Sequence, residues 1–215
     1  QVGGDTAALE ERLCSYLGRR YCVFAGRCTA AIFASLRASG IRGGRVALSA
    51  VSNPAPANAI LYAGLEPAFC DVDLESFNID LGSLSEVVES AGDVRAVLAV
   101  HLYGQPAPID GIMELARARG LFVVEDLAQA MGATYKGRKV GTFGDVSVVS
   151  FGHTKIVDVG GGGAALTDDP GLAQRIRAEL DALPSADERS TRLMEEYREV
   201  YYSLKRLAEV NPDLN

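Results

Sequence analysis

The sequence predicts an α/β fold built on a mostly parallel, doubly wound sheet of seven strands. Seven short apolar runs, mostly rich in Val and too short for helices, are each bounded by Gly, Pro or Asp. Such runs are typical of strands that are buried on both faces. Helical patterns lie between several of the runs, and this alternation of strand and helix favours parallel pairing.

The expected strands are 21–25, 45–50, 67–72, 94–100, 121–126, 146–151 and 163–167. The expected helices between them are 29–39, 58–64, 81–90 and 109–120. Gly40, Gly64 and Gly120 stand where the C-caps of three of these helices would fall.

The carboxyl-terminal part has a different character. Residues 171–210 carry helical periodicity, many charges and a cluster of Tyr, with Pro184 as the breaker. We interpret them as a helical excursion that leaves the sheet. The chain is therefore divided into a sheet domain over 1–170 and a helical segment over 171–215.

Composition and charge restrict the kinds of partner. The 215-residue chain has a formal net charge of -7 and no cluster of Lys and Arg, so a nucleic-acid partner is not expected. The four cysteines form no CxxC pair and there are two His, which predicts buried thiols in a reducing, cytoplasmic compartment and no metal site. With no signal peptide and no apolar run of about 18 residues, no membrane segment is expected.

Three groups of polar residues follow predicted strands, and ligands of such sheets bind beyond the carboxyl ends of the strands. The first is a strand, a glycine turn and a helix that could begin at Thr29, which suits either an anion site or a plain N-cap. The second is the pair Glu125 and Asp126 at the end of a buried strand. A carboxylate at that place either is buried and needs a cationic or N–H partner, or caps the segment that follows.

The third group follows the strand that ends near Ser150 and contains Lys155, with glycines at 160–163. A lysine amine becomes a nucleophile when it is desolvated or next to another cation, and otherwise stays a solvated side chain. Together the three groups match pyridoxal 5'-phosphate, which needs a phosphate site, an anion at its ring nitrogen and a lysine for its aldehyde. The glycines follow the lysine rather than open a helix, so they are neither a Rossmann nor a Walker fingerprint.

Several segments resemble, in order and spacing, the DegT–StrS family of pyridoxal-phosphate-dependent sugar aminotransferases, which have the aspartate aminotransferase fold (fold type I). The segments are "YLGRRYCVFAGRCTAAI", "AILYAGLEPAFCDVDLESFNID", "AVHLYGQPAPID", "VVEDLAQAMGATYKGRKVGTFGDVSVVSFGHTK" and "GGGGAALTDD". The resemblance runs from about residue 10 to residue 180. It implies the large domain of that fold, an α/β/α sandwich with a mostly parallel seven-stranded sheet, and a C-terminal small domain that is largely missing.

The resemblance also implies a role for each matched position. Lys155 resembles the lysine that takes the cofactor aldehyde and moves a proton, and Asp126 resembles the partner of the pyridine nitrogen. Gln129 matches the residue against the ring face or the phenolic oxygen. Thr29 and Ser150, with the backbone of Cys28, match the ligands of the phosphate.

Several positions depart from the family pattern, beginning with the phosphate turn, where Cys28 replaces Gly and Arg27 could add a contact to the phosphate. Asn53 stands where the family commonly has an aromatic residue that stacks on the ring, so we count it among the cofactor-binding residues without expecting stacking. His153 stands where Pro is frequent, and it suits either the substrate pocket or a capping role. Gly161 replaces the Glu of a Gly-Glu-Gly-Gly segment, which predicts a divergent substrate pocket.

The resemblance implies transfer of an amino group from an amino-acid donor, expected to be glutamate, to a keto group of a nucleotide-linked sugar or cyclitol in secondary metabolism, such as antibiotic biosynthesis. A homodimer, or a partner chain that supplies the small domain, would complete the site. The alternatives are a non-catalytic subunit that scaffolds a partner and a pyridoxal-phosphate enzyme with a non-sugar substrate. A dehydratase is disfavoured by Lys155, because dehydratases of this family carry His there.

Overall fold

The computed structural model describes residues 2–185 and 188–210. Contacts divide these residues into a compact unit that extends to Asp181 and a second unit that begins at Ala182. The compact unit ends later than the sequence-based boundary at residue 170, because helix α6 (Pro170–Asp181) packs on α2 (Cys28–Ala38). No helix in the described part of the chain is long and apolar enough to cross a membrane.

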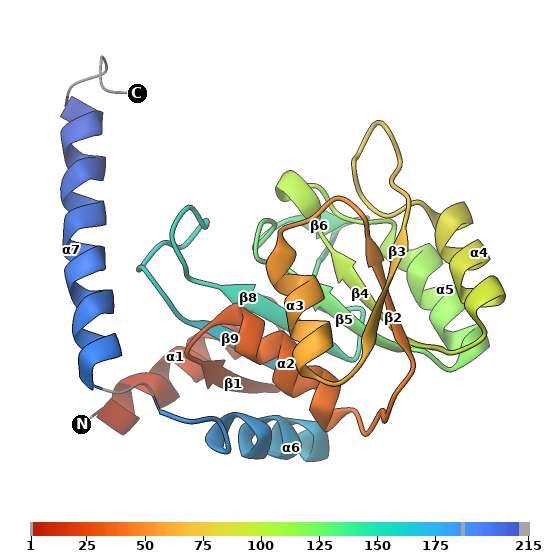
Figure 1. The fold of residues 1–215 in the computed structure, drawn as a ribbon, viewed down its shortest axis with the longest axis horizontal. Helices are drawn as coiled ribbons and strands as arrows, with labels where there is room; N and C mark the ends of the chain where they lie inside the picture. The colour runs from red at the N-terminus through yellow and green to blue at the C-terminus, as the bar shows by residue number, and fades with distance from the viewer. Residues whose placement is uncertain (1, 186–187, 211–215) are drawn as a thin grey trace. The chain divides into compact units, whose positions relative to one another are not determined.

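A seven-stranded sheet forms the centre of the compact unit (Figure 1). Its spatial order is β1-β9-β8-β5-β4-β2-β3. In chain order the strands are β1 (Tyr21–Ala25), β2 (Arg45–Ser49), β3 (Glu66–Cys70), β4 (Val94–Val100), β5 (Phe122–Asp126), β8 (Val146–Ser150) and β9 (Gly163–Thr167). All seven predicted strands are confirmed.

The direction of the strands brings distant parts of the sequence to one edge. Strand β9 is antiparallel to both of its neighbours, and the other neighbouring strands pair in parallel. Six strands therefore end at the same edge, and β9 begins there, with Gly163 paired to both Ala25 and Ser150. The predicted mostly parallel α/β fold is confirmed.

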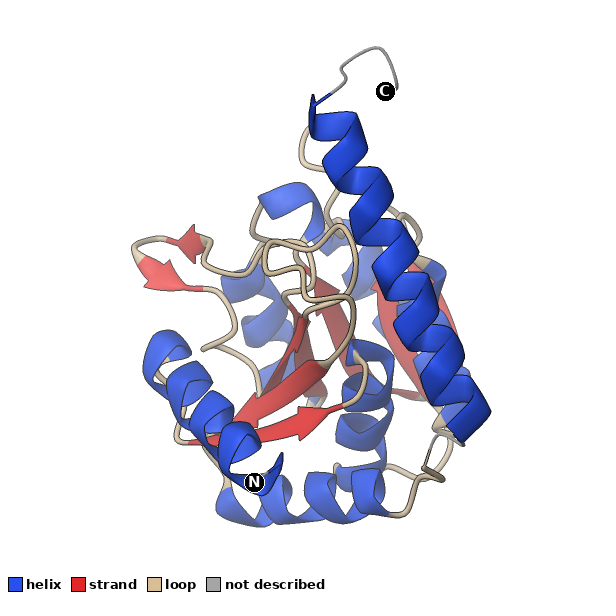
Figure 2. Ribbon diagram, turned by 90° about the vertical axis from the view of Figure 1, so that its left-hand side faces the viewer, coloured by secondary structure: helices blue, strands red, loops and turns tan. Residues whose placement is uncertain are grey.

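Helices cover both faces of the sheet, as the blue helices around the red strands in Figure 2 show. Helices α2, α3 (Pro54–Tyr62) and α6 share a core with Val46 and Leu48 of β2. Ala47, which points to the other face, packs with α4 (Leu81–Ala91) and α5 (Ile109–Arg119). Helix α1 (Val2–Leu17) packs on that second face against β8 and β9. The arrangement is an α/β/α sandwich.

Some elements were not foreseen from the sequence. They are α1, the 3-10 turn η1 (Leu102–Gly104) and the hairpin of β6 (Thr134–Tyr135) and β7 (Arg138–Lys139). The helical periodicity of residues 171–210 corresponds to two helices, α6 and α7 (Glu188–Val210), with Pro184 in the segment between them. Within the second unit, helix α7 carries exposed apolar side chains at spacings of four and three residues, among them Leu193, Tyr197 and Val200.

Candidate cofactor-binding site

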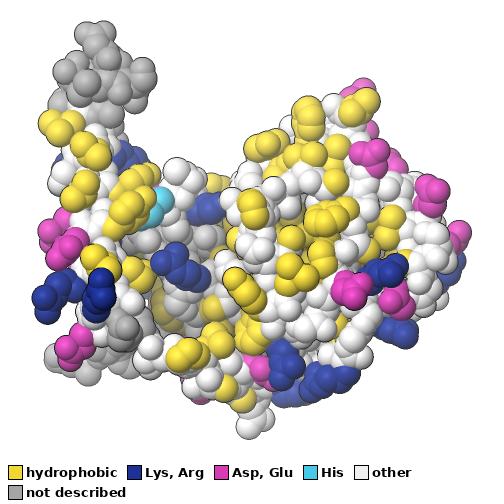
Figure 3. Space-filling view, viewed as in Figure 1, with side chains coloured by type: hydrophobic (Ala, Val, Ile, Leu, Met, Phe, Trp, Pro, Cys, Tyr) yellow, Lys and Arg dark blue, Asp and Glu magenta, His cyan; other side chains and the backbone are white. Residues whose placement is uncertain are grey.

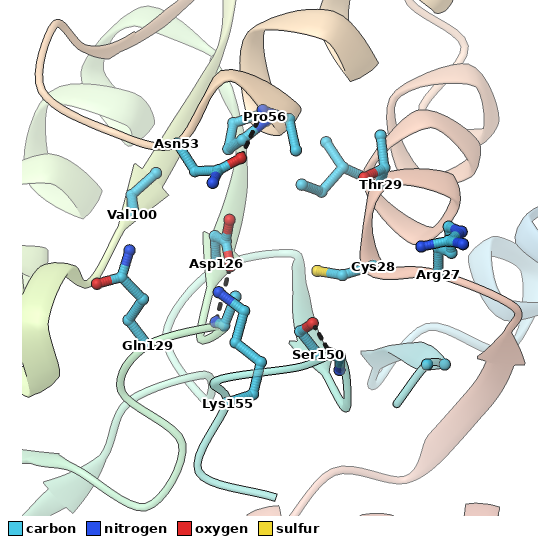
Figure 4. A pocket seen from close by; sticks show the side chains of 16 residues that line it. Arg27, Cys28, Thr29, Asn53, Pro56, Val100, Asp126, Gln129, Ser150 and Lys155 are labelled. Atoms are coloured by element: carbon cyan, nitrogen blue, oxygen red, sulfur yellow. Dashed lines mark hydrogen bonds between the residues drawn. The ribbon is translucent and has the colours of Figure 1, made fainter. Parts of the chain in front are cut away.

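A cavity of about 160 Å³ lies at the edge where the strands end (Figure 4). Most of the site residues selected from the sequence line it: Cys28, Thr29, Asn53, Asp126, Gln129, Ser150 and Lys155. Because a cavity of roughly 150 Å³ holds a benzene molecule, this cavity has room for a six-membered aromatic ring.

One wall of the cavity is the start of helix α2. The helix begins at Cys28, one residue before the expected start, and its N-cap, Arg27, has extended backbone angles. Its first backbone hydrogen bond is donated by Ala31 N–H to Arg27 O over 3.1 Å, so the preceding N–H groups of the first turn have no intrahelical acceptor. A Cβ atom on Gly163 would lie 2.6 Å from Cys28 N, so glycine is needed for β9 to approach the turn. Free N–H groups and the positive end of the helix dipole fit a phosphate.

Asp126 forms the floor of the cavity at the last position of β5. The side chain is 3% exposed, and its Oδ1 accepts a hydrogen bond of 2.8 Å from Ala128 N–H. Burial raises the pKa of Asp126, against the opposing effects of the Ala128 hydrogen bond and the Lys155 charge. A buried carboxylate with so few donors gains from a cationic N–H partner. A protonated pyridine nitrogen fits that requirement.

Lys155 reaches the cavity from the turn that follows β8. Thr154, directly before it, has a φ of +66°, a conformation that a β-branched residue rarely adopts. The backbone N–H of Lys155 donates to Gly152 O over 3.3 Å, which closes the turn. The side chain then extends across the cavity toward Asp126 (Figure 4). An amine on this side of the cavity and an anion on its floor suit the aldehyde and the ring nitrogen of one cofactor ring.

The hydroxyl of Ser150 lies lower in the same cavity, where its Oγ accepts a weak hydrogen bond of 3.4 Å from Gly152 N–H (Figure 4). The Gln129 side chain lines the opposite side, and its Oε1 accepts from Tyr103 N–H over 3.2 Å. Asn53 is the N-cap of α3, with its Oδ1 accepting from Ala55 N–H over 2.9 Å. The Asn53 amide therefore forms a polar part of the cavity lining next to α3.

His153 is the one selected residue outside the described set of cavity-lining side chains. Its Nδ1 lies 3.7 Å from Asp158 Oδ1, within the turn that carries Lys155. Its assignment to the substrate pocket stays a prediction.

The layer behind Asp126 is a polar network centred on Glu125, which is fully buried. Its carboxylate accepts hydrogen bonds of 2.7 Å from the N–H groups of Gly141, Phe143 and Gly144. Burial acts to raise the pKa of Glu125, but the hydrogen bonds from His101 and from the backbone outweigh it and hold the pKa below its ordinary value.

Both ring nitrogens of His101 are used within this network. Nδ1 accepts from Ala107 N–H over 2.9 Å, so the proton resides on Nε2, which lies 3.2 Å from Glu125 Oε2. Arg19, also buried, donates to Gly141 O and Gly144 O at 2.8 and 2.7 Å. The network connects β5 to the turn that leads into β8, and so joins the strands that carry Asp126 and Ser150.

The apolar part of the lining was not selected from the sequence. Val100, Ile32 and Pro56 line the cavity together with Ala128. Val100 is the last residue of β4, so the rule that ligands bind beyond the ends of parallel strands could have identified it. No comparable signal exists for Ile32 and Pro56, because apolar residues in helices ordinarily face the core.

Comparison with known proteins agrees with this geometry. The model of the DegT/DnrJ/EryC1/StrS aminotransferase family matches residues 1–204. GDP-perosamine synthase of Caulobacter vibrioides is 36% identical over 177 residues, which are 82% of this chain and 47% of the relative. L-glutamine:2-deoxy-scyllo-inosose aminotransferase of Streptomyces fradiae is 37% identical over 162 residues, covering 75% of this chain and 38% of the relative.

A solved structure with the same fold is NtdA of Bacillus subtilis with bound cofactor PMP. It superposes with a TM-score of 0.74 at 32% sequence identity, over 80% of this chain and 38% of NtdA. The chain thus spans less than half the length of each of these three proteins. Because the family model covers residues 1–204 of 215, the chain belongs to the DegT/DnrJ/EryC1/StrS aminotransferase family.

Proposed function

We propose that this chain binds pyridoxal 5'-phosphate and forms the cofactor-binding part of an aminotransferase. The amino group would pass from an amino-acid donor to a keto group of a nucleotide-linked sugar or a cyclitol. The observation that carries the proposal is one cavity in which the Lys155 amine, the buried Asp126 carboxylate and the start of α2 meet. These are the three groups that the aldehyde, the ring nitrogen and the phosphate of this cofactor require.

When bound, the cofactor supplies a protonated ring that withdraws electrons from the reacting carbon of the substrate. In the proposed site the Lys155 Nζ would hold the cofactor at its aldehyde and would move a proton at the reacting carbon of the donor. The Asp126 carboxylate accepts the hydrogen bond of the ring N–H and keeps that nitrogen protonated. Thr29, Ser150 and the first N–H groups of α2 hold the phosphate.

Two amide side chains would orient the ring. Gln129 lies on the side of the cavity opposite α2, where it can face the ring or its phenolic oxygen (Figure 4). Asn53 lines the edge next to α3. An amide has no aromatic face, so the contact of Asn53 with the ring would be polar rather than stacked.

The names of the two relatives support the proposed substrates. One relative makes a GDP-linked sugar by its name, and the name of the other gives L-glutamine and 2-deoxy-scyllo-inosose. A nucleotide-linked sugar or a cyclitol in secondary metabolism is therefore the proposed keto substrate. Glutamate is the proposed donor, and glutamine is the alternative to test beside it.

A partner subunit is part of the proposal. Large apolar side chains are exposed on the compact unit along α3, β3 and the segment after β3, namely Leu61, Tyr62, Phe69, Leu74 and Phe77. Apolar side chains of this kind also show on the face drawn in Figure 3. Grouped exposed apolar surface marks a protein interface, which supports a homodimer or a separate partner chain.

The four cysteines are free thiols, which supports a reducing, cytoplasmic compartment.

Absorption spectroscopy tests the proposal. We expect a visible band when pyridoxal 5'-phosphate is added to the chain, and no such band for Lys155→Ala, because the alanine cannot bind the aldehyde. Addition of L-glutamate or L-glutamine should then convert the band to that of the aminated cofactor. Absence of a band in the wild-type chain would contradict the proposal. A band that neither amino acid changes would favour a non-catalytic subunit that scaffolds a partner.

A further inference from the structure

The segment that carries Lys155 is anchored at both ends, but its apolar side chains are exposed between them. Phe151 N–H donates to Gly162 O over 3.1 Å, and Gly162 N–H donates to Gly26 O over 3.0 Å, so both ends are fixed to the edge of the sheet. The exposed apolar side chains are Ile156 (63%), Val157 (42%) and Val159 (57%). Burial of apolar surface therefore contributes little to holding this segment in place.

The backbone directly before Lys155 is held in an unfavourable conformation. Thr154 has a φ of +66°. For a residue with a Cβ atom this left-handed region is disfavoured by a factor of roughly ten, and a conformation of this kind persists where surrounding contacts impose it. Because φ of Thr154 sets the direction in which the chain enters residue 155, loss of this conformation would turn the Lys155 side chain away from the cavity.

The Asp158 carboxylate links the two halves of the turn. Its Oδ2 accepts a hydrogen bond from Thr154 N–H over 3.4 Å, and its Oδ1 accepts one from Gly160 N–H over 3.2 Å. Gly160 has a φ of +85°, which glycine adopts without strain. His153 Nδ1 lies 3.7 Å from Asp158 Oδ1, and the Asp158 side chain is 10% exposed. Hydrogen bonds to a carboxylate that is shielded from water are stronger than the same bonds at the surface.

We propose that Asp158 is a positioning residue, whose carboxylate holds Thr154 in the left-handed conformation and so keeps the Lys155 amine in the cofactor cavity. This inference rests on the proposed function, in which Lys155 binds the aldehyde of pyridoxal 5'-phosphate. Asp158 is not among the described residues that line the cavity. It acts through the backbone of the turn and not by touching the cofactor.

The test compares two ligands that differ at one group. Pyridoxal 5'-phosphate is held by its ring, its phosphate and Lys155, whose Nζ replaces the aldehyde oxygen as water leaves. 4'-Deoxypyridoxine 5'-phosphate has the same ring and phosphate but carries a methyl group in place of the aldehyde, so it cannot bond to Lys155. Calorimetry measures both affinities, and the difference between them reports the contribution of Lys155.

The variants remove the carboxylate in steps. Asp158→Ala removes both acceptor oxygens, and Asp158→Asn keeps one of them. Asp169→Ala is the matched control, because Asp169 Oδ1 also accepts from two backbone N–H groups, those of Gly171 and Leu172, at 2.8 and 3.0 Å. It follows the end of β9 and so lies at the edge of the sheet opposite to the cavity. The melting temperature of each variant checks that it folds.

We expect Asp158→Ala to weaken pyridoxal 5'-phosphate about tenfold, because the binding-competent turn is then populated about one tenth of the time. Affinity for the deoxy analogue should stay within about twofold of the wild type. Asp158→Asn should lose less, and Asp169→Ala should change neither affinity. In a Thr154→Gly background the loss caused by Asp158→Ala should shrink to about threefold or less, since glycine adopts a φ of +66° without strain.

Hydrogen exchange of the cofactor-free chain tests the turn without any ligand. The peptide that spans residues 152–160 should exchange about tenfold faster in Asp158→Ala than in the wild type, because the N–H groups of Thr154 and Gly160 lose their acceptor. The peptide should be unchanged in Asp169→Ala.

Two results would overturn the inference. The first is an Asp158→Ala variant that matches the wild type in hydrogen exchange and in affinity for pyridoxal 5'-phosphate. The second is equal weakening of both ligands, which would show that Asp158 supports the whole cavity and not Lys155. Failure of the proposed function is a separate result: the wild-type chain would show no visible band with pyridoxal 5'-phosphate, whatever the hydrogen exchange of Asp158→Ala.

Discussion

The two adjacent carboxylates at the end of β5, Glu125 and Asp126, are both buried but differ in how many hydrogen bonds they accept. Glu125 lies on one face of the strand and accepts hydrogen bonds from three backbone N–H groups, with His101 at 3.2 Å. Asp126 lies on the other face and accepts one hydrogen bond from Ala128 N–H. The pKa of Glu125 is lowered and the pKa of Asp126 is raised.

The difference shows how one strand can serve folding and binding at once. A buried carboxylate that is fully hydrogen-bonded stabilises the structure around it. A buried carboxylate with few donors carries a desolvation cost that a cationic ligand can relieve. Glu125 therefore holds the turn before β8, and Asp126 keeps its charge available to the cavity.

The largest expected effect comes from removing Glu125. Glu125→Ala leaves the N–H groups of Gly141, Phe143 and Gly144 without their acceptor. It also removes the partner of His101 Nε2 and the negative charge 3.8 Å from the Arg19 guanidinium. We expect the free energy of unfolding to fall by about 3–5 kcal/mol, the range for breaking a buried charged network. Urea unfolding monitored by circular dichroism measures it. A loss below about 1 kcal/mol would show that Glu125 does not hold the turn.

Asp126→Ala should act on binding rather than on folding. The free energy of unfolding should change by less than about 1 kcal/mol, because the loss of one hydrogen bond is offset by relief of the desolvation cost. Affinity for pyridoxal 5'-phosphate should fall tenfold or more, roughly the value of a charge-assisted hydrogen bond. Asp126→Asn is the control that keeps the shape of the side chain. Unchanged affinity and turnover in both variants would refute the role of Asp126.

As pH falls, the contributions of Glu125 and Asp126 to the free energy of unfolding should change in opposite directions. We expect these changes to be smaller than the effects of the two substitutions above. The lowered pKa of Glu125 contributes stability above the unfolded value of about 4.3, and this contribution is lost as pH falls through the lower folded value. The raised pKa of Asp126 makes its charge destabilising above the folded value, and protonation relieves this cost as pH falls.

Urea midpoints measured for wild type, Glu125→Ala and Asp126→Ala from neutral pH down to about pH 3 test these signs. The gap between wild type and Glu125→Ala should narrow as pH falls. Any excess of the urea midpoint of Asp126→Ala over that of wild type at neutral pH should disappear as pH falls, because protonation of Asp126 removes the cost of its buried charge in the wild type. Parallel profiles for all three proteins would contradict the opposite pKa shifts.

The sequence predicted the sheet well because buried parallel strands leave short Val-rich runs between turn residues. It did not predict α1, in which Gly3 and Gly4 interrupt the first turn although Leu9, Leu13 and Leu17 share one face. The β6–β7 hairpin has strands of two residues, too short for any periodicity to appear.

The site was predicted to the extent that its residues follow strands. Asp126, Ser150 and Lys155 were selected because the carboxyl ends of parallel strands meet at one edge. The Glu125 network could not be read in the same way, since Arg19 and the Gly141–Gly144 turn are brought to it only by the folded chain. Nor does the sequence tell which of the four glycines at 160–163 is needed by the backbone, because that depends on φ angles and on the distance to Cys28.

The most direct test of the central claim is to identify the lysine that binds the cofactor. The sequence contains four lysines, Lys136, Lys139, Lys155 and Lys205. The chain is incubated with pyridoxal 5'-phosphate, reduced with borohydride so that the bond to the amine becomes permanent, digested and mapped by mass spectrometry. We expect the added pyridoxyl mass on Lys155, at an occupancy that Asp126→Ala reduces. Label on the other three lysines in equal measure, or none on Lys155, would contradict the assignment of this cavity as the cofactor site.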